Sequence, residues 1–223
     1  MAPIDLTLAK GQTSALATNK VIKNTYMLLS MTLLFSALMA GLSVALKVPS
    51  WTSLVTFVAS IALIWLVLPR TANSTTGLWV VFAFTGLMGF GLGPLLSVYL
   101  SLPKGPQIVA TAMGGTGVIF LGLSAYALTT RKDFSFMGGF LFAGMLVVLV
   151  AALANIFLAM PALSLAISAV VILLMSGFIL YDTSQMVHGG ETNYILATVN
   201  LYLNIYNLFV HLLSLLGILG SDD

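Results

Sequence analysis

Residues 134–160 read FSFMGGFLFAGMLVVLVAALANIFLAM, and this stretch contains no charged side chain. An α-helix rises about 1.5 Å per residue, and a membrane-spanning helix needs about 20 mainly apolar residues. Backbone groups in lipid must satisfy their own hydrogen bonds, so only helices and closed barrels span membranes. A barrel strand covers about ten residues of alternating polarity, whereas this run is continuously apolar. The stretch therefore predicts a transmembrane helix.

Six more runs of this kind occur along the chain, separated by short loops. The seven predicted spans cover residues 24–46, 51–68, 77–100, 107–130, 134–160, 163–187 and 194–219. Of the 223 residues, 60% are hydrophobic and 6% are charged, whereas a soluble domain carries about 25% charged residues. We therefore expect an all-α, polytopic membrane protein with one seven-helix domain, residues 21–220, surrounded by the lipid bilayer.

Basic residues indicate how the spans are oriented, because cytoplasmic loops are enriched in lysine and arginine. Lys47 and Lys104 fall on one side of the predicted topology. Six basic residues fall on the other side: Lys10, Lys20, Lys23, Arg70, Arg131 and Lys132. This bias predicts that residues 1–20 form a short, mobile cytoplasmic tail. Seven crossings then place residues 221–223 on the opposite side of the membrane.

The sequence lacks the motifs of several classes of protein. It has no cysteine, which excludes disulfides, thiol catalysis and cysteine metal sites. It contains no metalloprotease helix, no nucleophile elbow and no phosphate loop. A net charge of +2 is too small to indicate nucleic-acid binding. We therefore expect neither an enzyme nor a cofactor, and no nucleic-acid partner.

Glycines are concentrated in the third, fourth and fifth spans, and Gly89 and Gly93 form a GxxxG pair. Small residues let helix backbones approach closely in lipid, where packing drives helix association. The pattern favours tight packing inside one bundle, and a dimer face or a hinge is the alternative.

Asp182 is the one acidic residue well inside a predicted span, about 8 Å from the cytoplasmic end of its helix. A charged carboxylate in a span costs up to about 3.5 kcal/mol on insertion scales, and the negative end of the helix dipole opposes an anion there. A local partner must offset these costs, or the group is protonated part of the time. Arg70, Arg131 and Lys132 end other helices on this side and are candidate partners. Asp182 is either a proton-sensitive or ion-contacting group, with a weak calcium contact as one form, or a carboxylate reaching interfacial water.

The last span carries a second polar signal, a stripe of side chains at steps of four, three and four residues. The stripe consists of Asn200, Asn204, Asn207 and His211, with Asn193 seven residues earlier. This spacing puts them on one helical face, which must avoid lipid because buried amides need partners. We therefore expect the last helix to be the most enclosed. Asp182 matches Asn200 in depth and can reach Asn204 but not His211. Asn155 lies at a similar depth to His211 and is its candidate partner. The stripe is either interhelical hydrogen-bonding or a path for water or ions.

Several segments together resemble the Bax inhibitor-1 family, and in particular its bacterial YccA branch. These are YDT at 181–183, HGGETNY at 188–194 and LYLNIYNLF at 201–209, supported by NTY at 24–26, AFTG at 83–86 and AYALTTRKD at 125–133. The resemblance covers nearly the whole chain. It implies a fold of seven helices in which the last helix is enclosed by the other six.

The resemblance also implies two functions. Some family members leak calcium in a pH-dependent way and sense pH with a pair of aspartates in the sixth and seventh helices. Asp182 matches the first aspartate, and the second falls on Asn204, where the carboxylate is missing. The YccA branch implies instead a modulator of FtsH, a membrane-anchored ATP-dependent protease of the bacterial inner membrane. Its members bind the protease and limit degradation of other membrane proteins. The tail, residues 1–19, is the segment that such a protease could grip.

Overall fold

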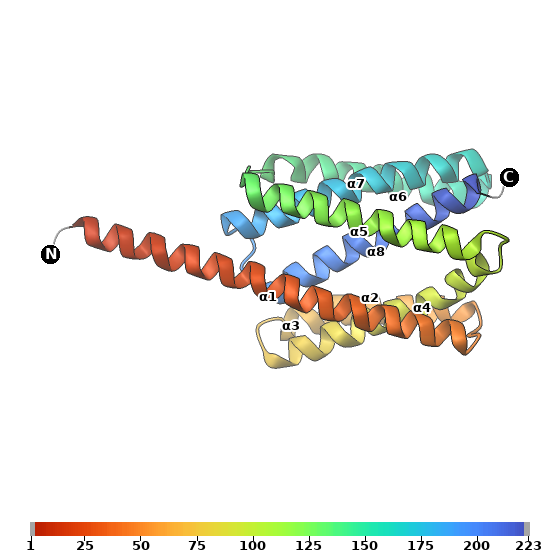
Figure 1. Cartoon of the computed structure of the whole chain (residues 1–223), viewed down its shortest axis with the longest axis horizontal. Coiled ribbons are helices and arrows are strands. Elements are labelled where there is room, and N and C mark those ends of the chain that lie inside the picture. Colours follow the sequence, from red (N-terminus) through yellow and green to blue (C-terminus); the bar gives the residue numbers. More distant parts are fainter. Residues whose placement is uncertain (1–2, 221–223) are drawn as a thin grey trace.

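The computed structural model describes the backbone of residues 3–220 and the side chains of residues 16–220, and every regular element in this part of the chain is helical. Seven helices are long and apolar enough to cross a membrane. They are Leu16–Ala45, Trp51–Thr71, Thr75–Leu100, Gly105–Thr130, Ser135–Leu158, Pro161–His188 and Tyr194–Leu219. The predicted all-α, seven-span fold is therefore confirmed, and the chain is a multi-pass membrane protein (Figure 1).

The long helices run up and down between two ends of the bundle. Their bounds are α1 (Pro3–Ala45), α2 (Trp51–Ala62), α3 (Leu68–Thr71), α4 (Thr75–Leu100), α5 (Gly105–Thr130), α6 (Gly138–Leu158), α7 (Pro161–His188) and α8 (Tyr194–Leu219). A π-helical turn, Leu63–Val67, joins α2 to α3, so the second span is one interrupted helix. Pro69 follows this turn and explains it, because a proline lacks the N–H that would bond four residues back and its ring crowds that carbonyl.

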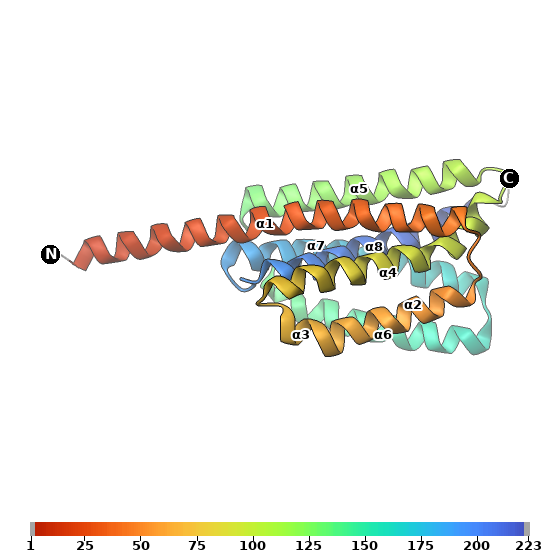
Figure 2. The same ribbon diagram turned by 90° about the horizontal axis from the view of Figure 1, so that it is seen from below.

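The first helix begins well before the first predicted span. Residues 3–20 continue α1 as helix and project beyond the bundle, on the side where α7 ends and α8 begins (Figures 1 and 2). The physical reason is that no proline occurs between Pro3 and Pro49, and proline is tolerated in the first turn of a helix. We call this end of the bundle the N-terminal side. The predicted C-terminal end, residues 221–223, lies outside the described residues.

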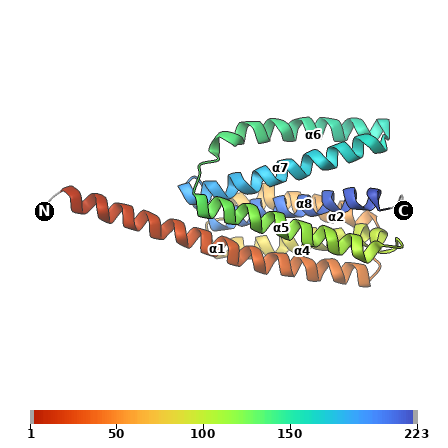
Figure 3. The same cartoon turned by 45° about the horizontal axis from the view of Figure 1, so that its top comes forward.

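Helix α8 lies between two groups of helices, with α1 to α4 on one side and α5 to α7 on the other (Figure 1). It packs directly against α1, α4, α5 and α7. In the described part of the chain the backbones of α2 and α6 do not come close to it, and hollows lie between them and α8, as described below. Figure 3 shows α6 at the edge of the bundle, beside α7.

The expectation that the last helix is enclosed agrees with the structure. Helices α4 and α8 each bury eleven residues, and the exposed residues of α8 are Asn200 and Leu219. Helix α4 owes its burial to close packing on both α1 and α2.

Glycines of α4 permit this close packing. A Cβ at Gly89 would collide with the backbone carbonyl of Ser36 in α1, and one at Gly93 with the side chain of Ser43. The GxxxG pair therefore packs inside the bundle, as the sequence favoured. Gly117 and Gly122 of α5 behave differently, because a Cβ at either position would meet no other atom within 4 Å.

A buried hydroxyl network fixes α1, α4 and α8 at the centre of the bundle. The Ser36 and Tyr202 hydroxyls lie 2.6 Å apart, and Tyr202 donates to the Thr85 carbonyl at 3.3 Å. The Tyr202 ring also packs edge-on against Phe84. Tyr202 is almost fully buried, so its hydroxyl needs such partners in a medium without water.

Candidate functional site

One hydrogen bond joins an acidic side chain to an amide side chain across the described α7–α8 interface. It links Asp182 to Asn204. Asn204 Nδ2 donates to Asp182 Oδ2 at 2.6 Å. Asp182 lies six residues before the end of α7 and Asn204 is the eleventh residue of α8, so Asn204 lies somewhat deeper and the two side chains span the difference. Asn204 is 7% exposed. The predicted reach of Asp182 to Asn204 is therefore realised, and the bond satisfies an amide that would otherwise be buried without a partner.

Two hollows meet at this pair. The mouth hollow, about 190 Å³, lies at the N-terminal side and is lined by Tyr181, Asp182, Gln185, Gly190, Glu191, Ala197 and Asn200. The inner hollow, about 340 Å³, lies between α6, α7 and α8 and is lined by Met145, Met175, Phe178, Asp182, Asn200, Leu203, Asn204 and Asn207. Asp182 and Asn200 line both. Each hollow has room for water and offers it polar partners, so the pair stands where a polar entrance meets the bundle interior.

The expected cationic partners do not approach Asp182. Arg70, Arg131 and Lys132 form no ion pair with it among the described side chains. Arg131 and Lys132 instead contact the end of α7 through their backbone carbonyls, which accept from His188 Nε2 and Ser184 Oγ. The charged neighbour that shares the mouth hollow with Asp182 is Glu191, another acid. An amide, and not a cation, is therefore the group that stabilises this carboxylate.

The asparagine stripe divides into members with different surroundings. Asn200 is exposed to the two hollows, whereas Asn207 donates to the Leu203 carbonyl of its own helix at 2.8 Å. His211 Nδ1 lies 3.2 Å from Ser168 Oγ of α7. Asn155, expected as the partner of His211, donates to Ser164 and accepts from the Met160 N–H. That expectation is wrong because a shared depth does not fix which faces of two helices meet.

Asn193 lies off the stripe and serves as the N-cap of α8. Its Oδ1 accepts from the Ile195 and Leu196 N–H groups, and its Nδ2 donates to Ala72 O at 3.0 Å and Asn73 Oδ1 at 2.8 Å. It therefore ties the start of α8 to the loop before α4. The signal was available in the sequence, because asparagine directly before a helical run is a preferred cap.

The end of α7 is attached to the loop between α5 and α6, which sequence reasoning missed. Ser184 Oγ accepts from the Phe134 N–H at 2.9 Å, and the two ring nitrogens of His188 face the carbonyls of Ser184 and Arg131 at 2.9 and 3.1 Å. Asp133 in this loop accepts from the Ser135 N–H at 2.8 Å. That hydrogen bonding to Ser135, and secondarily the charge of His188, lowers the pKa of the Asp133 carboxyl.

The chemistry open to this site is limited by its single deeply placed carboxylate. No group of three or more His, Cys, Asp or Glu side chains that could hold a metal occurs in the described part of the chain. A tight calcium site needs six to eight oxygen ligands, so Asp182 with nearby amides could supply at most part of one. The arrangement can bind and release a proton at Asp182 and can admit water to it.

Comparison with known proteins shows which family this sequence matches. The model of the family "Inhibitor of apoptosis-promoting Bax1" matches residues 18–221. An uncharacterized membrane protein of Vibrio cholerae is 54% identical over 93% of both chains. The "Modulator of FtsH protease YccA" of Escherichia coli K12 and the "Inner membrane protein YccA" of Escherichia coli O6:H1 are each 54% identical over 95% of both chains. The similarity therefore covers all seven spans.

Proposed function

This chain belongs to the Bax inhibitor-1 family, and from that premise we propose that it is a non-enzymatic modulator of an FtsH-type protease in a bacterial inner membrane. The observation that carries the proposal is 54% identity over 95% of both chains to a protein named as a modulator of that protease. In this role the chain binds the protease and limits degradation of other membrane proteins.

The shape of the molecule supports this role. Residues 3–20 form the one segment of the described backbone that projects well beyond the bundle (Figure 2). A protease that starts at a chain end needs such a free segment. The lysine and arginine bias of the loops supports a cytoplasmic N-terminus, and seven crossings then put the C-terminus on the opposite side. The close packing of α4 on α1 stabilises the bundle, and a slow, competing substrate requires a stable fold.

Deletion of residues 2–18 tests the proposal, because residues 19–45 of the first spanning helix remain and exceed the about 20 that a span needs. We expect the deletion to abolish both the degradation of this chain by the protease and the inhibition of the protease by this chain. The helical circular dichroism and the thermal unfolding of the bundle should be retained. A matched control replaces residues 2–18 by a Gly/Ser segment of equal length, which is flexible. It separates a need for length from a need for this sequence. Unchanged inhibition after the deletion would show that the tail is not the binding segment.

A second candidate function is a pH-sensitive calcium or proton leak that passes Asp182. It is favoured by one observation, the meeting of the mouth and inner hollows at Asp182 and Asn200. The test is flux into proteoliposomes between pH 5.5 and 8 for the wild type and Asp182→Asn, which keeps an amide for Asn204 to bond. A changed flux or pH dependence is expected. Wild-type flux at every pH would reject the leak.

A further inference from the structure

A second kind of hollow lies on the side of α8 away from Asp182. It is a groove of about 520 Å³ between α1, α4, α5 and α8. It exists because the backbones of α1 and α5 stay apart in the described part of the chain, and the two helices meet through side chains, as in the contact of Tyr26 with Phe120, whose ring centroids lie 6.0 Å apart. Its two facing walls are apolar or small; they include Ala37, Gly41 and Val44 of α1, and Met113, Gly117 and Phe120 of α5. A Cβ added at Gly41 or at Gly117 would meet nothing within 4 Å, so the two glycines leave this space open.

The position of the groove within the membrane is set by its wall on α1. That wall runs from Leu33 to Val44, next to the end of α1 at Ala45. Leu100, the last residue of α4, also lines it. The groove therefore opens in the half of the bilayer opposite the N-terminal side and extends toward the midplane.

The walls of the groove favour hydrocarbon over water as its occupant. Three of the four hydroxyl groups that line it are already bonded, since Ser36 and Tyr202 bond each other and Thr116 donates to the Ala112 carbonyl; the fourth belongs to Tyr206. Water needs two to four polar partners to occupy a cavity, and these walls offer few. An empty groove of this volume would forfeit the dispersion contacts of its lining.

The dimensions select one kind of occupant. From Leu33 to Val44 the α1 wall is about 17 Å long at roughly 1.5 Å per residue, close to half of a hydrocarbon core of about 30 Å. Phe120 lines the groove and also contacts Tyr26 of α1, so side chains close the groove toward the N-terminal side. A partner helix that crosses the whole bilayer could therefore not follow it, whereas one acyl chain of a single leaflet matches its length.

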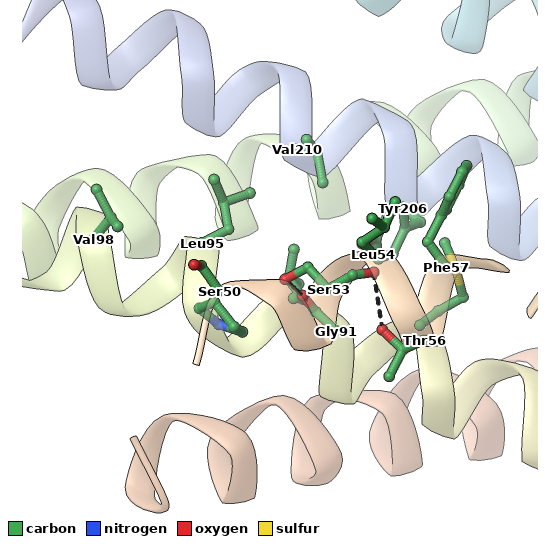
Figure 4. A pocket seen from close by; sticks show the side chains of 13 residues that line it. Ser50, Ser53, Leu54, Thr56, Phe57, Gly91, Leu95, Val98, Tyr206 and Val210 are labelled. Carbon is green, nitrogen blue, oxygen red and sulfur yellow. Dashed lines mark hydrogen bonds between the residues drawn. The ribbon is translucent and has the colours of Figure 1, made fainter. Parts of the chain in front are cut away.

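A neighbouring hollow is a poorer candidate. It has about 650 Å³ and lies between α2, α4 and α8, with side chains of all three helices directed into it (Figure 4). Tyr206 and Leu92 line both this hollow and the groove and separate the two. Its α2 wall carries Ser50, Ser53 and Thr56, so it is not a continuous hydrocarbon surface.

We propose that the groove between α1 and α5 holds one acyl chain of a membrane phospholipid, which completes the packing between α1, α5 and α8. The proposal is independent of the protease and leak functions. It predicts that a side chain of suitable size placed in the groove replaces the lipid chain.

Gly117→Leu tests this, with Gly122→Leu as its matched control. Both changes lie in the middle of α5, both glycines have open space around them, and only Gly117 lines the groove. The gain in helix propensity is the same for both. Thermal unfolding is measured in detergent after delipidation, before and after addition of phosphatidylethanolamine, and retained lipids are counted by native mass spectrometry.

We expect the wild type and Gly122→Leu to gain thermal stability with added phospholipid. Gly117→Leu should start at a higher unfolding temperature, lose this lipid-dependent gain and retain one lipid fewer. Gly41→Leu, on the opposite wall, should repeat the result and guards against a folding defect peculiar to position 117. An unchanged lipid count and lipid-dependent gain in both groove variants would overturn the proposal. Disulfide-linked dimers of Gly117→Cys in vesicles would also overturn it, because a second copy would then occupy the groove.

Discussion

Replacing Asn204 by Asp puts a second carboxylate against Asp182. The present N···O distance is 2.6 Å, and two unit charges at that separation repel by roughly 6 kcal/mol at an effective dielectric constant of about 20. One pH unit corresponds to about 1.4 kcal/mol, so the repulsion is worth between about four and five pH units. The two carboxylates would therefore share one proton over a wide range and titrate as a coupled pair.

The assay is calcium flux into proteoliposomes between pH 5.5 and 8, with wild type, Asn204→Asp and a control measured together. The control is Asn207→Asp, which adds a carboxylate to the same inner hollow but whose parent amide bonds the Leu203 carbonyl and not Asp182. We expect a pH-dependent flux in Asn204→Asp that the wild type and Asn207→Asp lack.

Three results would refute parts of this reasoning. If Asn204→Asp has the pH profile of the wild type, Asp182 and position 204 are not the titrating element. If Asn207→Asp behaves like Asn204→Asp, added charge in the hollow matters and the contact with Asp182 does not. If the wild type itself leaks and Asp182→Asn alters the leak, one carboxylate suffices.

Three further predictions concern stability. Gly89→Ala, which drives a methyl group into the α1 backbone, should destabilise the bundle by about 1–3 kcal/mol in reversible unfolding; Gly122→Ala, with open space around it, should be neutral or slightly stabilising, and equal effects would refute the packing argument. Asn193→Ala removes the N-cap of α8 and should cost about 1 kcal/mol; an unchanged unfolding midpoint would show that the cap is dispensable. Folding lowers the pKa of the Asp133 carboxyl, so this group stabilises the fold at pH values above its pKa in the unfolded chain. The stabilisation is lost as the pH falls through its pKa in the folded chain. Asp133→Ala should therefore lower the unfolding temperature at pH 7 but not at pH 2.

The spans were predictable because the signal for them is local. Seven long apolar runs fix seven helices whatever their packing, and the start of α8 at Tyr194 agrees with the predicted residue. The contact between Asp182 and Asn204 was also predictable, since an up–down arrangement of adjacent helices makes depth a function of residue number. The helical extension of α1 over residues 3–20 was not predictable, because the polar residues there give no apolar signal.

Contacts that depend on helix rotation could not be read from the sequence. His211 and Asn155 lie at a similar depth, but the faces of α6, α7 and α8 that meet decide whether they touch, and Ser168 takes that place. The hollows were harder still to predict. They exist where the backbones of two helices stay apart, as those of α1 and α5 do in the described part of the chain, and such a gap leaves no pattern of residues to recognise. Open glycines such as Gly117 and packed ones such as Gly89 look alike in the sequence.

The amide at position 204 bears directly on which function this site serves. Its Nδ2 donates to Asp182, and an amide can donate to a carboxylate as well as to the carbonyl oxygen of a protonated carboxyl group. The α7–α8 contact therefore holds whether or not Asp182 carries a proton. Two aspartates would keep such a contact only while they share a proton, and would repel once both are ionised. The amide thus removes the repulsion that would separate α7 from α8 with rising pH. A bundle that stays closed at every pH suits a slowly degraded modulator better than a pH-gated leak.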